Sequence, residues 1–294
     1  MTIDFYHVCS SGTYETLMFR SDTDFVRGVN DILVCSLKYD IEIYAYCLMN
    51  NHFHFRLRGE YLDVKRFAKA YLQRRLAAIK KVYSEIKHSE DIDLSIKHIA
   101  DTDYLRGVCG YILRNPMAAG MNVIPTAYLW SSANMYFNDN NHCLPSGRKL
   151  SSLSIRMQRE LFSSKVLLPQ DLVLDDNNLV FPGQYVKVHE MEQYFNNPRQ
   201  FSFYLSKNND VEYETDSGIL KSVKFRDDEL YQSLEGICIN RFSSSYKSLS
   251  IERRCIAAAD LVKKYRLTTS RAARISSLPP DLLSGILGRY PRKQ

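Results

Sequence analysis

The sequence predicts an α+β fold over residues 1–136, followed by a mostly helical region. Three observations predict this: short runs rich in aromatic and β-branched residues, amphipathic stretches between them, and a change of composition after residue 136. The chain has 294 residues, which is enough to bury a full core and suggests about two domains. Apolar residues at 45% and charged residues at 24% are typical of a globular protein and exclude a disordered or collagenous one.

The elements of the first part follow from local patterns. Aromatic and β-branched enrichment or period-two alternation predicts strands at 3–9, 41–49 and 52–58. Helical spacing predicts one helix that starts at Asp22 or Asp24, a long basic helix over 61–87, and a third from Asp101 or Thr102 to about residue 114. Residues 88–100 are polar and acidic and are predicted to form a loop. Pro116 is expected to stop or kink the third helix.

The second part divides by composition. Residues 137–152 resemble a linker, and residues 153–250 are mixed and mostly helical, with no chemical motif. Helices are predicted over 252–265, 270–276 and 280–288. Three short helices with a turn before the last are typical of a helix-turn-helix, so 251–294 is interpreted as a basic helix-turn-helix-like segment.

Basic residues gather in two places although the net charge is only +6. Residues 251–294 carry ten Lys and Arg against three acids, and residues 61–87 carry eight against two. Solvated helix faces would explain this, but contact with a polyanion at two places is the alternative that we carry forward. The residues expected to contact DNA are Lys65, Arg66, Lys69, Arg74, Arg75, Arg271, Arg274 and Arg289.

Other features narrow the class of protein. No run of about 18 apolar residues is present, so a membrane span is not expected. The first ten residues lack a basic region before an apolar stretch, which argues against a secretory signal. Seven scattered cysteines without a CxxC pair indicate reduced thiols, and hence a cytoplasmic protein.

His52 and His54 form the sharpest chemical feature. In a strand, residues i and i+2 point to the same face, so both imidazoles share one face while Phe53 enters the core. Neutral imidazole binds first-row divalent ions, so the pair supplies part of an open metal site. Two unrelated strand histidines are the alternative.

Tyr111 and Asn115 are the second feature. They lie four residues apart in GYILRNP and therefore share a helix face. An amide oxygen suits Mg²⁺ or Mn²⁺, and a tyrosine one turn earlier would lie beside the same ion. A core tyrosine next to a helix-ending asparagine is the alternative.

Taken together and in order, these motifs resemble a known family. They are similar to the motifs of REP-associated tyrosine transposases, which are single-tyrosine members of the HUH (His-hydrophobic-His) endonucleases. The matching segments are, in chain order, YAYCLMNNHFHFRLR, YLRGVCGYILRNPMAAGM and AYLWSSANMYF. The opening FYHVCSSG also resembles that family's first strand. The resemblance covers residues 1–136. Three positions depart from the family pattern, at Ser11, Asn50 and Ala118, and two of them replace arginines.

The resemblance implies a fold, a site and an activity. The fold would be ferredoxin-like, an antiparallel sheet with helices packed on it. His52, His54 and Asn115 would hold Mg²⁺ or Mn²⁺, and Tyr111 would be the nucleophile. The activity would be nicking and strand transfer of single-stranded or hairpin DNA through a 5′-phosphotyrosine, as in DNA transposition. Two cuts need two active sites, which predicts a homodimer.

A second function remains open at this stage. The same fold with the C-terminal segment would also serve a DNA-binding regulator with little or no cleavage, and duplex DNA is the partner expected of a helix-turn-helix. The complete set of His52, His54, Tyr111 and Asn115 favours the enzyme, because a pure binding protein does not need that set.

Overall fold

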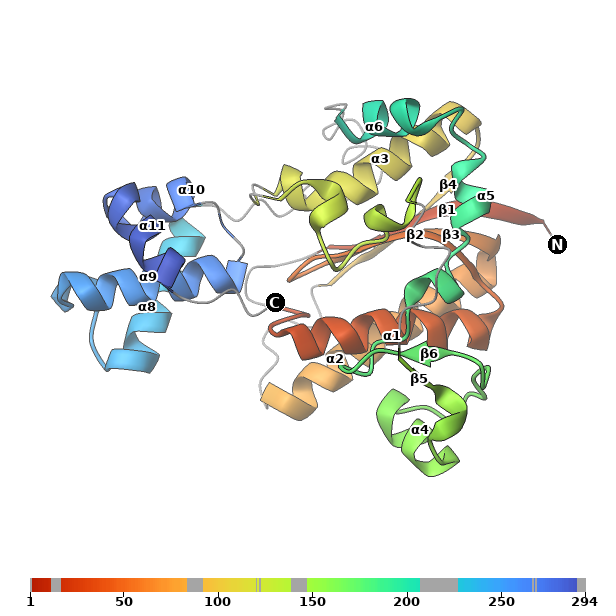
Figure 1. The fold of residues 1–294 in the computed structure, drawn as a ribbon, viewed down its shortest axis with the longest axis horizontal. Coiled ribbons are helices and arrows are strands. Elements are labelled where there is room, and N and C mark those ends of the chain that lie inside the picture. Colours follow the sequence, from red (N-terminus) through yellow and green to blue (C-terminus); the bar gives the residue numbers. More distant parts are fainter. Residues whose placement is uncertain are drawn as a thin grey trace. The chain divides into compact units, whose positions relative to one another are not determined.

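In the computed structural model, the chain folds into two units (Figure 1). The first unit comprises Met1–Pro116 with Ile124–Ser222, and the second comprises Met117–Val123 with Val223–Gln294. The structure describes residues 2–11, 17–83, 92–119, 121, 123–138, 147–206, 227–265, 267 and 269–289.

A four-stranded antiparallel sheet organises the first unit, with strand order β2-β3-β1-β4. Its strands are β1 (Ile3–Ser10), β2 (Glu42–Leu48), β3 (Phe53–Glu60) and β4 (Leu94–Ile99). The helices that follow them are α1 (Asp22–Tyr39) after β1, α2 (Tyr61–Tyr83) after β3 and α3 (Thr102–Ala118) after β4. This βαββαβ order with β1 and β3 at the centre is the ferredoxin-like topology. The predicted α+β class and antiparallel sheet are therefore confirmed.

The two faces of the sheet are covered by different helices. Helices α1 and α2 lie against one face, and α3 lies against the other (Figure 1). On the first face, the buried rings of Phe53 and Phe55 contact Tyr71 of α2 at centroid distances of 4.9 and 4.8 Å. Because side chains alternate along a strand, His54, between these phenylalanines, faces α3.

Polar side chains start the helices where the sequence suggested. Ser21 caps α1, and its hydroxyl accepts a hydrogen bond from the Asp24 backbone N–H while the Asp24 carboxylate accepts from the Ser21 N–H. At α3, the Asp101 carboxylate accepts from the Tyr104 N–H at 2.7 Å. Both arrangements satisfy backbone donors that the first helical turn leaves free.

One prediction about local structure was wrong, and a second was wrong in part. Residues 94–99 form strand β4, not a loop, and pair with β1 alone at the sheet edge. Most side chains of this short strand are half-buried, which explains its polar composition. Pro116 lies inside α3 and does not stop it, since the helix continues to Ala118, while the alternative of a kink stays a prediction.

The segment WSS follows the outer edge of β2. The Leu48 N–H donates to the Trp130 carbonyl at 2.9 Å, and the Ser132 N–H donates to the Tyr46 carbonyl at 3.0 Å. The Trp130 ring stacks on Phe25 of α1 at 4.9 Å. The motif therefore covers part of an edge strand that would otherwise expose unpaired backbone groups.

Residues 147–206 wrap around the sheet and belong to the first unit. They contain β5 (Arg148–Lys149), α4 (Ile155–Phe162), β6 (Val173–Leu174), α5 (Val188–Glu192) and α6 (Pro198–Ser206). Apolar residues of 150–180 pack on Leu33 and Val34 of α1. The Lys187 N–H then donates to the Ile43 carbonyl of β2 at 2.8 Å. Part of the region expected to be a linker is thus a paired strand, while residues 139–146 lie outside the described residues.

Four helices account for most of the second unit. They are α8 (Asp227–Phe242), α9 (Ile251–Tyr265), α10 (Thr269–Ser276) and α11 (Pro280–Arg289). The three terminal helices expected from the sequence are present, and Ser277, with φ of 51°, makes the turn before α11. Leu267 pairs with Met121, so the residues after α3 pack within this bundle. No helix in the described ranges is long and apolar enough to cross a membrane.

Candidate active site

Three residues predicted as metal ligands meet on the α3 side of the sheet. The His52 Nε2 lies 2.9 Å from the Asn115 Oδ1, and the Asn115 Nδ2 lies 3.0 Å from the His54 Nε2. The two imidazole rings are 5.1 Å apart at their centroids and nearly perpendicular. One amide thus bridges two imidazoles from a different element, which is the juxtaposition that the motifs suggested.

The backbone explains this convergence. Residues 49–52 form a tight turn in which the Met49 N–H donates to the His52 carbonyl at 2.8 Å, and β3 begins at the next residue. His52 and His54 therefore flank Phe53, which is fully buried in the opposite face. Asn115 lies in the last turn of α3, and like both histidines it is buried. Side chains from the start of β3 and the end of α3 thus share one enclosed place.

Burial keeps both histidines neutral. Desolvation lowers the pKa of His52 to about 4, an effect that its hydrogen bond with Asn115 partly opposes. Desolvation also lowers the pKa of His54 well below its usual value, and the neighbouring His52 and His7 lower it further. A neutral imidazole has a free lone pair on one nitrogen, and this is the form that binds metal ions.

The donor set fits a divalent cation. The His52 Nδ1 lies 2.8 Å from the Asn51 Oδ1, while its Nε2 faces the Asn115 oxygen. A neutral imidazole has one N–H, so with these amide orientations it donates to one oxygen and leaves the other contact without a proton. A cation at the Nε2 would remove this conflict, because Nδ1 would then donate to Asn51 as the outer nitrogen of ligating histidines does. Of the two contacts, the one between His52 Nε2 and Asn115 Oδ1 joins two candidate ligand atoms, and its 2.9 Å is close to the about 3 Å between adjacent ligands of an octahedral Mg²⁺ or Mn²⁺.

Tyr111 lies beside the same histidines, one turn before Asn115 on α3. Its ring packs edge-on against His54 and His7 at centroid distances of 5.3 and 5.8 Å. Helix α3 contains a second tyrosine, Tyr104, which is the other candidate nucleophile on this helix. Lys97 of β4 lies over its ring at 5.6 Å. Of these two tyrosines, Tyr111 is therefore the one placed next to the candidate metal ligands.

Two further residues lie beside His52, His54, Asn115 and Tyr111 and complete a buried polar cluster. They are His7 and Cys9 of β1, which sequence reasoning missed. His7 donates or accepts a hydrogen bond with the His54 Nδ1 at 3.1 Å, and Cys9 pairs with His54 across the strands. Ligand atoms of His7, Cys9 and His54 all lie within 4.8 Å of one another. The signal was the opening strand FYHVC, in which residues 7 and 9 share a face, but which face that is depends on pairing with β3.

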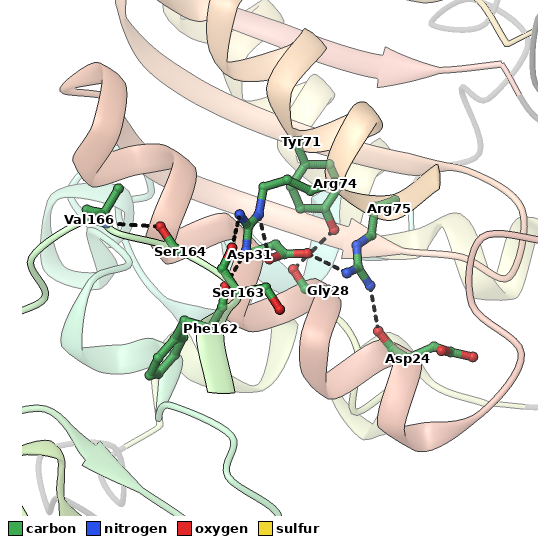
Figure 2. A network of polar contacts seen from close by, with 10 residues as sticks. All are labelled: Asp24, Gly28, Asp31, Tyr71, Arg74, Arg75, Phe162, Ser163, Ser164 and Val166. Atoms are coloured by element: carbon green, nitrogen blue, oxygen red, sulfur yellow. Dashed lines mark hydrogen bonds and ion pairs between the residues drawn. The ribbon is translucent and has the colours of Figure 1, made fainter. Parts of the chain in front are cut away.

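Two of the arginines expected to contact DNA are engaged inside the first unit. Figure 2 shows Arg74 and Arg75 of α2 directed at Asp31 of α1. The Arg74 Nε donates to Asp31 at 2.7 Å, and Arg75, which is 2% exposed, also pairs with Asp31 and donates to the Asp24 carbonyl at 2.9 Å. A contact between these guanidiniums and DNA would require the ion pairs to open.

The other basic residues of α2 have different surroundings. Lys65, Arg66 and Lys69 are exposed, and Arg66 also pairs with Asp63 at 2.8 Å. Tyr71, in contrast, is fully buried and its hydroxyl donates to the Gly28 carbonyl at 3.2 Å. Helix α2 thus presents a basic outer face and an aromatic inner face, and contact of the outer face with DNA stays a prediction.

In the second unit, Arg271 and Arg274 both pair with Asp227, at 3.2 and 2.6 Å. Arg271 is largely covered, whereas 69% of the Arg274 side chain remains exposed. The side chain of Arg289 lies outside the described residues. Contacts of this bundle with DNA therefore remain a prediction, with Arg274 as its most accessible described candidate.

Comparison with known proteins adds one partial match. A solved structure of a REP-associated tyrosine transposase bound to a REP hairpin is similar to 45% of this chain and 78% of its own, with 13% identity and a TM-score of 0.36. No protein family and no curated protein matches the chain. Because similarity at this level carries no weight for activity, the assignment below is drawn from the side chains and the sequence motifs.

Proposed function

We propose that this protein nicks and rejoins single-stranded DNA through a phosphotyrosine formed by Tyr111, as a transposase or a domesticated relative of the single-tyrosine HUH class. One observation carries the proposal: Asn115 contacts both His52 and His54, while Tyr111, one turn away, packs on His54. A nucleophile beside a neutral nitrogen–oxygen donor set is what metal-assisted phosphodiester cleavage requires.

The reaction follows from these groups. The Tyr111 oxygen forms a bond to phosphorus, and the bond from phosphorus to the 3′ oxygen breaks. The phenolic proton passes through solvent to the leaving oxygen, so the products are a 5′-phosphotyrosine and a 3′ hydroxyl. A divalent ion, when bound by His52, His54 and Asn115, supplies Lewis-acid polarisation of the phosphate. Reversal by another 3′ hydroxyl joins strands without ATP, because the phosphotyrosine conserves the bond energy.

The burial of the site favours a single strand as substrate. Tyr111 is 3% exposed and Asn115 2% exposed, so DNA of any kind reaches them only after a local opening, and a single strand needs a smaller opening than a rigid duplex. A single strand has a flexible backbone and a smaller cross-section, and it also has its bases free to stack. A hairpin beside the cleaved strand would supply a duplex for the basic surfaces. Joining after two cuts would use the tyrosines of two copies.

A DNA-binding regulator is the competing function, and the bundle of α9, α10 and α11 favours it as an additional role. These helices have the order of a helix-turn-helix, and they carry a high density of basic residues in the sequence. In the enzyme this bundle would hold duplex DNA while the first unit cleaves a strand. In a regulator the same contacts would form and no covalent product would appear.

The test is a search for the covalent product. We would incubate the full chain with Mn²⁺ and a library of hairpin-flanked single strands, and detect protein–DNA adducts on denaturing gels. We expect an adduct that Tyr111→Phe removes and Tyr104→Phe keeps, with DNA binding retained in both variants. An adduct mapped by peptide mass spectrometry to another tyrosine would refute the assignment. Binding without any adduct would favour the regulator.

A further inference from the structure

His7 lies at the centre of the buried polar cluster but has no role in the reaction described above. It is in the middle of β1, where it pairs with Arg56 of β3, and two residues further along Cys9 pairs with His54 on the same face. Only 1% of His7 is exposed. A polar ring buried at this depth costs free energy unless a hydrogen-bond partner satisfies its nitrogens.

That partner is the nitrogen of His54 that faces away from Asn115. The His7 Nε2 lies 3.1 Å from the His54 Nδ1, and the two rings are nearly parallel, with an interplanar angle of 14° and centroids 5.4 Å apart. The other ring nitrogen of His54, Nε2, lies 3.0 Å from the Asn115 Nδ2. Each nitrogen of His54 thus has its own hydrogen-bond partner, His7 at Nδ1 and Asn115 at Nε2.

These contacts select one tautomer of His54. An amide nitrogen can only donate, so with the Asn115 amide as oriented here the His54 Nε2 must accept and carries no proton. Neutral His54 therefore holds its proton on Nδ1 and donates it to the His7 Nε2. The lone pair of His54 Nε2 is then directed to the side where His52 and Asn115 converge.

We propose that His7 is a positioning residue that holds His54 in the Nδ1–H tautomer, so that Nε2 carries no proton and its lone pair can bind the divalent ion in place of the Asn115 N–H. The proposal rests on the proposed function, because it assigns His7 to the metal site of that enzyme. Histidine ligands usually donate their outer N–H to a carboxylate, a carbonyl or water, and here a second imidazole would fill that position. Tyr111, which packs on both rings, would gain its orientation from the same pair.

The same cluster has a competing interpretation. In it, His7, Cys9 and His54 are direct ligands of one ion, since their ligand atoms lie within 4.8 Å of one another. That site would use the His54 Nδ1 and a thiolate, which select softer metals than Mg²⁺ or Mn²⁺. The two interpretations therefore predict different ligand nitrogens on His54 and a different response to a thiolate-binding metal.

The test compares two substitutions in the full chain without DNA. His7→Leu fills the space but accepts no hydrogen bond, whereas His7→Gln keeps an oxygen that can accept from His54 Nδ1–H. We expect His7→Leu to weaken Mn²⁺ binding, measured by electron paramagnetic resonance of free Mn²⁺, by about 10- to 100-fold. His7→Gln should restore most of the affinity, and His54→Ala should abolish it. Equal losses in both His7 variants, or none in His7→Leu, would overturn the proposal.

Two further measurements keep the proposal falsifiable if His7→Leu fails to fold. In the metal-free wild-type protein, ¹H–¹⁵N correlations of the imidazoles should show His54 protonated at Nδ1, and protonation at Nε2 would overturn the proposal. Co²⁺ should bind without the intense thiolate-to-metal absorption band, whose presence would assign Cys9 as a ligand and refute a positioning role for His7. Wild-type protein that binds no Mn²⁺ would refute both the metal site and the role of His7. Mn²⁺ binding without a DNA adduct would refute the proposed function alone.

Discussion

The two faces of the sheet are built from the same strands but carry opposite chemistry. On the face covered by α1 and α2, Phe53 and Phe55 of β3 pack on aromatic rings of α2. On the face covered by α3, His52, His54 and Arg56 take the alternating positions, and all three are buried. One face therefore has the composition of an ordinary protein core, and the other encloses polar groups that a core normally excludes.

The apolar face stabilises the protein, whereas burying the polar groups of the other face costs stability. Apolar burial behind β3 contributes favourable free energy in proportion to its area. Arg56 on the other face is fully buried, has unpaired Nε and Nη2 atoms, and is held by cation–π contacts with Phe5, Tyr44 and Tyr194 at 4.7 to 5.0 Å. Such groups are expected at functional sites, where local rules are broken and compensated elsewhere.

The largest effect that separates the faces is expected at the histidines. His52→Ala or His54→Ala should each abolish Mn²⁺-dependent cleavage, because each removes a ligand from a site with few others. The fold should persist, as judged by circular dichroism and by thermal melting without metal. Excess chelator should reproduce the loss in the wild-type protein. Full activity in either variant, or in chelator, would show that these histidines do not hold a catalytic ion.

The matching substitution on the other face should do the reverse. Phe55→Ala removes a ring that is fully buried between Phe67 and Tyr71. We expect the free energy of unfolding to fall by about 3 to 5 kcal/mol, as for other buried phenylalanines. The Mn²⁺ affinity of the folded fraction should stay within a few-fold of wild type. A small loss of stability in urea unfolding would mean that this face is not the principal core.

The success of sequence reasoning differed between local and distant relationships. The spacing of His52 and His54, and of Tyr111 and Asn115, determines which residues share a strand or helix face, so each pair could be predicted. Their meeting came from the family resemblance, since no local signal joins residues 63 positions apart. His7 was missed for the same reason, because its contact with His54 depends on the register of β1 against β3.

Counting basic residues in the sequence also failed to reveal contacts between distant segments. Arg74 and Arg75 contributed to a basic helix in the sequence, but Asp31, which pairs with both, lies on another helix. Strand β4 was missed because an edge strand of six residues, mostly half-buried, carries little of the apolar pattern of a central strand. Helical spacing therefore located α2 in the sequence, but only the fold shows that two of its arginines already pair with Asp31.

The pH dependence of stability should also distinguish the faces, because His52, His54 and Arg56, whose pKa values are lowered, all lie on the face covered by α3. The pKa of His52 is lowered from 6.5 to about 4, so the unfolded chain binds a proton that the folded chain excludes between these values. Stability contributed by neutral His52 is complete above pH 6.5 and is lost as the pH falls toward 4, by about 3 kcal/mol. Urea unfolding from pH 7 to 4 should show a smaller decline in His52→Gln. An identical decline would show that His52 is not desolvated.

The smallest effect is expected on the outer face of α2, behind the apolar side of the sheet. Lys65 and Lys69 are exposed there, and we propose that they contact phosphates of a bound strand away from the cleavage site. Each lost phosphate contact lowers the dependence of log affinity on log salt by about 0.7 for a single strand. Lys65→Gln with Lys69→Gln should therefore reduce that slope by about 1.4.

The cleavage rate at saturating DNA should not change in this double variant, because α2 lies on the opposite side of the sheet from Tyr111 and the histidines. Lys38→Gln with Lys165→Gln removes the same charge from exposed positions on other segments and serves as the control. An equal change of the salt dependence in the control would show that the loss of net charge, and not the loss of contacts by Lys65 and Lys69, causes the effect. An unchanged slope in the α2 variant would leave that basic face as a solvated surface, and DNA binding would then depend on the α3 side and on the second unit.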